Sequence, residues 1–172
     1  MANETTVRKL AAILSADVVG YSRLMERDEE ATLAELKAIR TEIIDPSLKL
    51  RHGTVVKTMG DGLLIEFSSI VEAVRNAIEI RDAVYQRNLE VPENERLVFR
   101  VGVNLGDVIV EDGDIYGDGV NIAARLQMLA EPNGVCISAD AHNQIRDKLE
   151  NQFDGMGERE VKNIARPIRV WG

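Results

Sequence analysis

The sequence is poor in several residue types, and each scarcity excludes a class of protein. A single cysteine, Cys136, rules out an internal disulfide and favours a reducing compartment, so we expect a cytoplasmic protein with Cys136 in its core. Aromatic residues make up only 4% of the chain, so Leu, Ile, Val and Ala must fill the core. The apolar run at residues 10–19 is too short to span a bilayer, so we expect no membrane contact. The formal net charge of −8 argues against a nucleic-acid partner.

The remaining composition is that of a globular domain, with 45% hydrophobic and 29% charged residues. A chain of 172 residues suggests one domain with a substantial core. We therefore expect a single domain over residues 1–172, with residues 1–8 as a flexible N-terminal segment.

Hydrophobic periodicity and turn signals predict alternating strands and helices. A first strand at about 9–19 precedes a helix that we expect to end near Asp45-Pro46, because a residue before proline resists the helical conformation. Ser69 and Glu72 form a capping box that opens a second helix. The further predicted elements are a hairpin at 54–67, strand segments at 97–103 and 107–110, a helix at 120–129, a strand at 135–138, a short helix at 139–149, and closing strands at 157–162 and 167–171.

Without its C-terminal part, this order is β-α-β-β-α-β. That order predicts an α+β, ferredoxin-like core sheet with helices on one face and extra C-terminal strands and a helix. The second face of the sheet then needs a cover. Either a partner protomer or the C-terminal elements of the same chain can supply it.

Two acidic residues stand at the ends of predicted strands. Asp61 lies at the tip of the hairpin, in Gly60-Asp-Gly62, and Asp17 ends the buried first strand. Taken alone, Asp61 is explained as a turn former and Asp17 as a strand terminator. Together, two carboxylates from neighbouring strand ends are the ligands that Mg²⁺ prefers.

Three further features carry possible chemistry. Gly20 joins the first strand to a helix, a junction that is either a simple connection or a phosphate turn. Asn121 and Arg125 are four residues apart, so they share a helix face, as a solvated pair or as an anion site. Strand alternation places Lys57 on the face of Val55 and Met59, where it is either a rim charge or a ligand donor.

Four segments in this order resemble the catalytic domain of class III adenylate and guanylate cyclases, and the resemblance covers residues 10–170. The segments are Ser15-Ala-Asp-Val-Val-Gly-Tyr-Ser22, Lys57-Thr-Met-Gly-Asp61, Phe99-Arg-Val-Gly-Val103 and Asp114-Ile-Tyr-Gly-Asp-Gly-Val-Asn-Ile-Ala-Ala-Arg125. The resemblance implies the nucleotide-cyclase type of fold.

The resemblance also implies a role for each matching residue. Asp17, Asp61 and the carbonyl of Val18 would bind two divalent cations, Mg²⁺ or Mn²⁺. The base would be selected by Lys57 and Asp114, and the transition state stabilised by Asn121 and Arg125. The residues that would contact the phosphates are Gly20, Tyr21, Ser22 and, by a loose alignment, Lys162.

The implied reaction converts ATP to 3′,5′-cyclic AMP and pyrophosphate. In this family the acids and the base-selecting residues of one active site come from different protomers, so a homodimer with two composite sites is implied. The alternatives are a guanylate cyclase and a silent nucleotide-binding or dimerisation module. The chain departs from many relatives in its short segment at 111–113 and in carrying Asp107 where several relatives have a basic residue.

Overall fold

The computed structural model describes residues 7–149, 155–159 and 168–171. In chain order the elements are β1 (Val7–Val18), α1 (Tyr21–Arg27), α2 (Glu29–Ile39), the π-helical turn η2 (Arg40–Ile44), α3 (Asp45–Arg51), β2 (Thr54–Met59), β3 (Gly62–Phe67), α4 (Ile70–Asn88), the 3₁₀ turn η3 (Glu93–Glu95), β4 (Phe99–Glu111), β5 (Asp114–Tyr116), α5 (Asp118–Leu129), β6 (Gly134–Ser138), α6 (Ala139–Ile145), β7 (Gly155–Arg159) and β8 (Ile168–Trp171).

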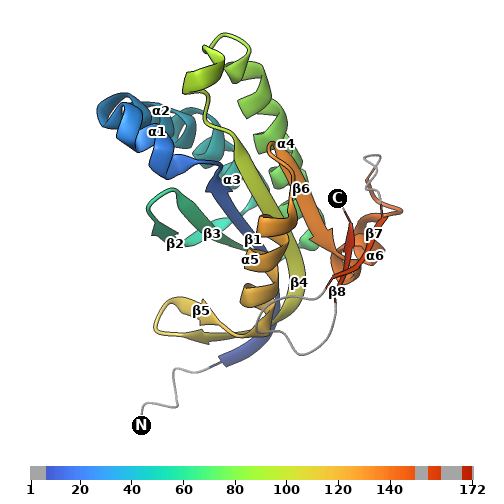
Figure 1. The fold of residues 1–172 in the computed structure, drawn as a ribbon. Coiled ribbons are helices and arrows are strands. Elements are labelled where there is room, and N and C mark those ends of the chain that lie inside the picture. Colours follow the sequence, from blue (N-terminus) through green and yellow to red (C-terminus); the bar gives the residue numbers. More distant parts are fainter. Residues whose placement is uncertain (1–6, 150–154, 160–167, 172) are drawn as a thin grey trace.

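The predicted ferredoxin-like core is confirmed by the order of the strands. The sheet runs β2-β3-β1-β4-β6-β8-β7, and β5 pairs with the far end of β4 (Figure 1). The pairs β2–β3, β3–β1 and β1–β4 are all antiparallel, as the core requires, whereas β6 is parallel to β4. The C-terminal elements therefore extend the core sheet at its β4 edge.

Two hydrophobic layers lie on opposite faces of the sheet. On one face, Leu14 and Ile65 pack with Val74 of α4 and with Ile39, which ends α2. On the other face, Ile13 and its neighbours pack with α5 and with β5 (Figure 1). The sequence analysis left two possible covers for this second face, a partner protomer or later elements of the same chain. Over the middle of β1, the cover is formed by α5 and β5 of the same chain.

Helix α5 can lie close to the sheet because β4 carries a glycine beneath it. A Cβ atom on Gly102 would fall 2.3 Å from the backbone nitrogen of Gln127 and 2.4 Å from the carbonyl oxygen of Ala123. No side chain fits there. The hydroxyl of Ser15 then donates a buried hydrogen bond of 2.9 Å to Oε1 of Gln127, which fixes the C-terminal end of α5 against β1.

Three sequence predictions about element ends are wrong. The first long helix does not end at Asp45-Pro46 but continues through α3 to Arg51. Pro46 has no N–H to donate, and the helix continues past it because a π-helical turn precedes it. In that turn the Asp45 N–H bonds to the Arg40 carbonyl five residues back.

The segments 97–103 and 107–110 are not separate strands, because residues 99–103 and 107–110 both belong to the continuous strand β4, which begins at Phe99. Residues 7 and 8 belong to β1 rather than to a flexible segment, and residues 1–6 lie outside the described part of the chain. None of the helices in the described part has the length and apolar character needed to cross a bilayer.

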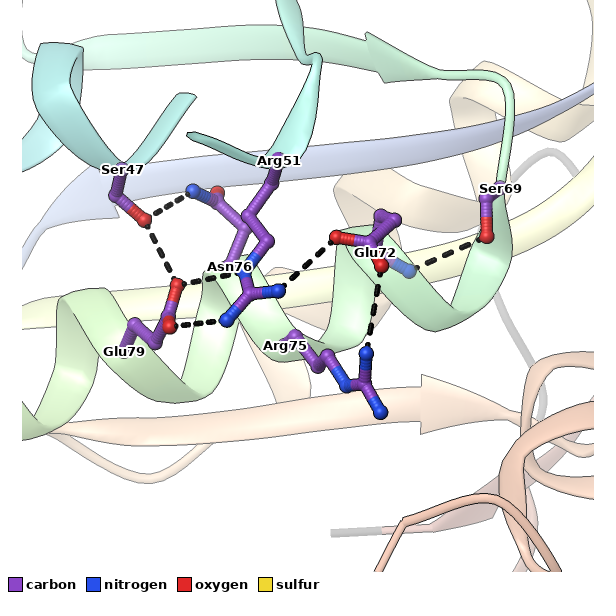
Figure 2. Close-up of polar contacts among 7 residues, drawn as sticks. All are labelled: Ser47, Arg51, Ser69, Glu72, Arg75, Asn76 and Glu79. Carbon is purple, nitrogen blue, oxygen red and sulfur yellow. Dashed lines mark hydrogen bonds and ion pairs between the residues drawn. The ribbon is translucent and has the colours of Figure 1, made fainter. Parts of the chain in front are cut away.

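A polar network joins α3 to α4 (Figure 2). Arg51 donates to both oxygens of Glu79, at 2.6 and 3.0 Å, and to Glu72 at 3.3 Å. Ser47 donates to Glu79 at 3.2 Å and accepts a 2.7 Å bond from the buried side chain of Asn76. The hydrogen bond from Arg51 is the main cause that lowers the pKa of Glu79, against the opposing effect of burial. The network therefore stabilises the fold more strongly while Glu79 is ionised.

This dependence predicts an acid-sensitive contribution to stability. Because the folded-state pKa of Glu79 lies below its unfolded value of about 4.3, the contribution is complete above that pH and is lost as the pH falls through the folded pKa. Urea titrations at pH 7 and at about pH 3.5 should show a smaller loss of unfolding free energy for Glu79→Gln than for the wild type. Glu90→Gln, at an exposed position, should behave as the wild type. Equal losses in wild type and Glu79→Gln would contradict the prediction.

Candidate active site

The two acidic residues singled out in the sequence lie at one edge of the sheet. β1 and β3 are neighbours, with Ala16 opposite Leu63, so the end of β1 meets the turn that carries Asp61. Oδ2 of Asp61 accepts a hydrogen bond of 2.8 Å from the backbone N–H of Val18, the residue after Asp17. The hairpin tip that carries Asp61 is therefore attached to the end of β1, at the residue after Asp17.

Asp17 has a cationic partner that sequence reasoning missed. Arg100 stands opposite Asp17 in the β1–β4 ladder, with Nη2 to Oδ2 at 3.1 Å and Nε to Oδ1 at 3.3 Å. Both side chains are 27% exposed, so water screens the pair only in part. Arg100 lies within a quoted motif, but its contact depends on strand register, which the sequence does not state.

The donor set of this edge fits a small, hard cation. Asp17 and Asp61 offer carboxylate oxygens, and Oδ1 of Asp61 has no hydrogen bond within the described chain. Mg²⁺ is commonly held by one or two carboxylates, with substrate phosphates and water completing its shell. No group of three or more His, Cys, Asp or Glu residues suited to a metal occurs among the described residues.

The turn after β1 brings the predicted phosphate-contact residues beside the acids. Gly20 has a φ of 65°, a conformation that favours glycine, and it directly precedes α1. Tyr21 packs partly against the core and Ser22 is exposed. Gly20, Tyr21 and Ser22 thus follow Asp17 and Val18 without any intervening element.

The predicted base-selecting pair forms a direct contact. Nζ of Lys57 lies 2.9 Å from Oδ2 of Asp114, with side chains 33% and 30% exposed. Hydrogen bonding from Lys57 is the main cause that lowers the pKa of Asp114, so this carboxyl is ionised at neutral pH. Tyr116, which the sequence analysis missed, lies beside the pair: its ring centroid is 5.7 Å from Nζ of Lys57, and the charge of Asp114 raises the pKa of its hydroxyl.

Lys57 reaches Asp114 because β2 contains a bulge. Val55 is opposite Ile65, yet Lys57 is opposite Leu64, so one residue of β2 is left without a partner in the ladder. The bulge reverses the alternation and turns Lys57 away from the face of Val55. The prediction that Lys57 shares a face with Val55 is therefore wrong, and its physical reason is this bulge.

Asn121 and Arg125 lie one turn apart on α5, as their spacing predicts. Asn121 is exposed and Arg125 is half-buried, with Nη1 3.4 Å from the sulfur of Met128. Within the described chain, no hydrogen bond or ion pair links Asn121, Arg125 or the Lys57–Asp114 pair to Asp17 or Asp61. Lys162 lies outside the described residues.

The hydrogen bond between Asp61 and Val18 gives a testable difference between two substitutions. Both Asp61→Ala and Asp61→Asn remove the charge, but only Asn keeps an oxygen that can accept from the Val18 N–H. We expect the Asn variant to be more stable than the Ala variant by about 1 kcal/mol in urea unfolding. Amide exchange at Val18 should be faster in Asp61→Ala than in Asp61→Asn. Equal stabilities and equal exchange rates would show that the bond does not hold the hairpin tip.

Comparisons with known proteins show the family to which the chain belongs. A family model described as the adenylate and guanylate cyclase catalytic domain matches residues 5–171. The chain is 49% identical over 171 residues to "Putative adenylate cyclase 3" of Rhizobium meliloti, with 99% of this chain covered. It is 33% identical over 148 residues to an adenylate cyclase of Streptomyces coelicolor, with 85% of this chain covered. The chain spans 29% and 37% of the lengths of these two relatives.

A solved structure described as an adenylate/guanylate cyclase/hydrolase from Silicibacter pomeroyi superposes with a TM-score of 0.91. Its sequence is 48% identical, and the match covers 96% of each chain. The mixed sheet and its helices are thus shared with a nucleotide cyclase domain along nearly the whole chain. By its family match, by these relatives and by its fold, the chain belongs to the adenylate and guanylate cyclase catalytic domain family.

Proposed function

We propose that this chain is an adenylate cyclase domain that forms 3′,5′-cyclic AMP and pyrophosphate from ATP. The ribose 3′-oxygen attacks the α-phosphorus, the bond from that phosphorus to the bridging oxygen of the β-phosphate breaks, and the 3′-hydroxyl proton passes to solvent. The observation that best supports the proposal is the hydrogen bond from the Val18 N–H to Asp61, which attaches the hairpin tip to the residue after Asp17. The adenylate cyclases among the relatives point to the same reaction.

Asp17, Asp61 and the Val18 carbonyl would hold two divalent cations, Mg²⁺ or Mn²⁺. When bound, the cations would lower the pKa of the 3′-hydroxyl and offset charge on the leaving pyrophosphate. Arg100 gives one hydrogen bond to each carboxylate oxygen of Asp17, and each oxygen keeps a second lone pair with which it could bind a cation. The ion pair with Arg100 thus keeps the Asp17 side chain oriented.

The remaining roles follow the family pattern residue by residue. Gly20, Tyr21 and Ser22 would contact the β- and γ-phosphates, and Lys162 the terminal phosphates. Arg125 would meet the charge that develops on the α-phosphoryl group, with Asn121 as a second fixed donor. Fixed donors of this kind are typically worth on the order of a hundredfold or more in rate.

The Lys57–Asp114 contact favours adenine as the base. The lowered pKa of Asp114 keeps its carboxylate an acceptor, suited to the exocyclic amine of adenine. Lys57 can donate to a ring nitrogen of the same base. Guanine would present a carbonyl where Asp114 needs a donor, and the carboxylate would be left unpaired.

Two copies of the chain would complete each site. Asp17 and Asp61 would come from one protomer, and Lys57, Asp114, Asn121 and Arg125 from its partner. The absence of any bond between these two sets in the described chain is consistent with a division between subunits. In a two-fold dimer each set meets its complement twice, which gives two equivalent sites.

Base choice can be tested by steady-state turnover of ATP and GTP with Mn²⁺. We expect kcat/KM for ATP to exceed that for GTP by roughly tenfold or more, because one unpaired buried polar group costs about that much. Asp114→Ala should bring the kcat/KM values for ATP and GTP closer together, mainly by lowering the value for ATP. Equal or faster GTP turnover would make the domain a guanylate cyclase. Binding of ATP and Mn²⁺ without any cyclic nucleotide, even at high protein concentration, would make it a silent nucleotide-binding module.

The division between protomers can be tested by mixing two inactive variants. Asp17→Ala and Asn121→Ala should each be inactive alone, whereas their equimolar mixture should regain about a quarter of wild-type activity. Random pairing gives half heterodimers, each with one intact site of two. A mixture of Asp17→Ala and Asp61→Ala is the matched control, and it should stay inactive because both changes affect the same half. Failure of the first mixture, with heterodimers shown to form, would rule out a shared site.

A further inference from the structure

The exposed face of α5 carries a methionine beside the arginine of the candidate site. Asn121, Arg125 and Met128 follow one another at helical spacing, so they share one side of α5. Ala123 and Leu126 are buried on the opposite side of the helix. Met128 is 55% exposed, which is unusual for an apolar side chain of this size. Its thioether is therefore within reach of small molecules dissolved in water.

The sulfur of Met128 contacts the guanidinium group of Arg125. Nη1 of Arg125 lies 3.4 Å from the Sδ atom of Met128. A thioether is a weak hydrogen-bond acceptor, so Arg125 can leave this contact at little cost in free energy. Within the part of the chain that the structure describes, Arg125 has no ion pair with a carboxylate. No acidic side chain there competes with Met128 for its N–H groups.

Helix packing fixes Met128 and Arg125 relative to each other. α5 lies directly on the sheet (Figure 1), where a Cβ atom on Gly102 would clash with the helix backbone. The buried side chain of Gln127, the residue before Met128, accepts the hydrogen bond from Ser15. The helix therefore cannot turn on the sheet. A chemical change at the sulfur of Met128 acts directly on its neighbour Arg125.

We propose that Met128 is an oxidation site whose sulfoxide binds Arg125 and withdraws it from the candidate active site. One oxygen atom passes from hydrogen peroxide to Sδ, the sulfur is oxidised by two electrons, and the peroxide is reduced to water. The sulfoxide oxygen is a polar acceptor, so its hydrogen bond from the charged guanidinium is stronger than that of the thioether. Methionine sulfoxide reductases, with a dithiol as reductant, remove the oxygen as water and reverse the change.

The chain contains a matched control for this site. Met59, at the end of β2, is 67% exposed and therefore at least as accessible to peroxide as Met128. In the described part of the chain its sulfur forms no hydrogen bond. The lone thiol, Cys136, is buried. An effect that depends on Met128 but not on Met59 would thus come from the contact with Arg125 and not from oxidation in general.

The effect on turnover rests on the proposed function and is measured by cyclic AMP formation before and after mild peroxide treatment. Oxidation should lower kcat of the wild type roughly tenfold, because one strong hydrogen bond must break before Arg125 can act. KM for ATP should change little, because Arg125 is proposed to act in the transition state. Met128→Leu should keep its kcat after peroxide, whereas Met59→Leu should lose activity as the wild type does.

Reversal of the oxidation identifies the modified group. Sulfoxide reductases with dithiothreitol should restore kcat of the oxidised wild type, and dithiothreitol alone should not, because it reduces oxidised thiols but leaves sulfoxides. Equal loss of kcat in the wild type and in Met128→Leu would overturn the proposal. Recovery with dithiothreitol alone would also overturn it, since a thiol would then be the modified group.

Labelling of arginine with phenylglyoxal, read by peptide mass spectrometry, tests the contact without catalysis. After peroxide, Arg125 should be labelled more slowly in the wild type than in Met128→Leu. Arg146, exposed at the end of α6, is the control and should be labelled equally in both. Oxidised Met128 with unchanged labelling of Arg125 would overturn the proposal even if the chain forms cyclic AMP. Slower labelling in a chain that forms no cyclic nucleotide would support the oxidation site and overturn the proposed function.

Discussion

The candidate site depends on one hydrogen bond between a hairpin tip and the end of the neighbouring strand. The Val18 N–H has no strand partner at that point and binds a carboxylate oxygen of Asp61 instead. The bond satisfies a backbone donor at the sheet edge and fixes a second acid next to Asp17. Local folding and the chemistry of the site are thus served by the same contact, because the residue that completes the backbone bonding is also a candidate metal ligand.

The negative charges of Asp17 and Asp61 repel each other, and nearby groups of the same chain offset this repulsion. Arg100 neutralises Asp17 from the adjacent strand, and the Val18 N–H faces Asp61. A cation bound by Asp17 would be repelled by the positive charge of Arg100, so metal binding and the Arg100 contact are linked.

The sequence allowed the core topology to be predicted, and the contacts that it did not reveal at the candidate site have physical causes. The Asp-Gly hairpin signal and the buried first strand correctly predicted that the turn with Asp61 lies at the end of the strand that carries Asp17. The sheet face on which Lys57 lies could not be predicted, because a bulge in β2 breaks the alternation of side chains and the amino-acid composition of the strand does not reveal it. Arg100 and Tyr116 were missed because their contacts come from register and from the folding back of β5, which are set by tertiary packing.

The central claim is that a carboxylate pair on one copy of the chain needs a second copy to form cyclic AMP. The most direct measurement is the initial rate of cyclic AMP formation against protein concentration, with sedimentation on the same samples to count monomers and dimers. The rate should rise faster than in proportion to concentration while monomers dominate and become proportional once dimers prevail. A rate strictly proportional to concentration in samples that are entirely monomeric would contradict the claim.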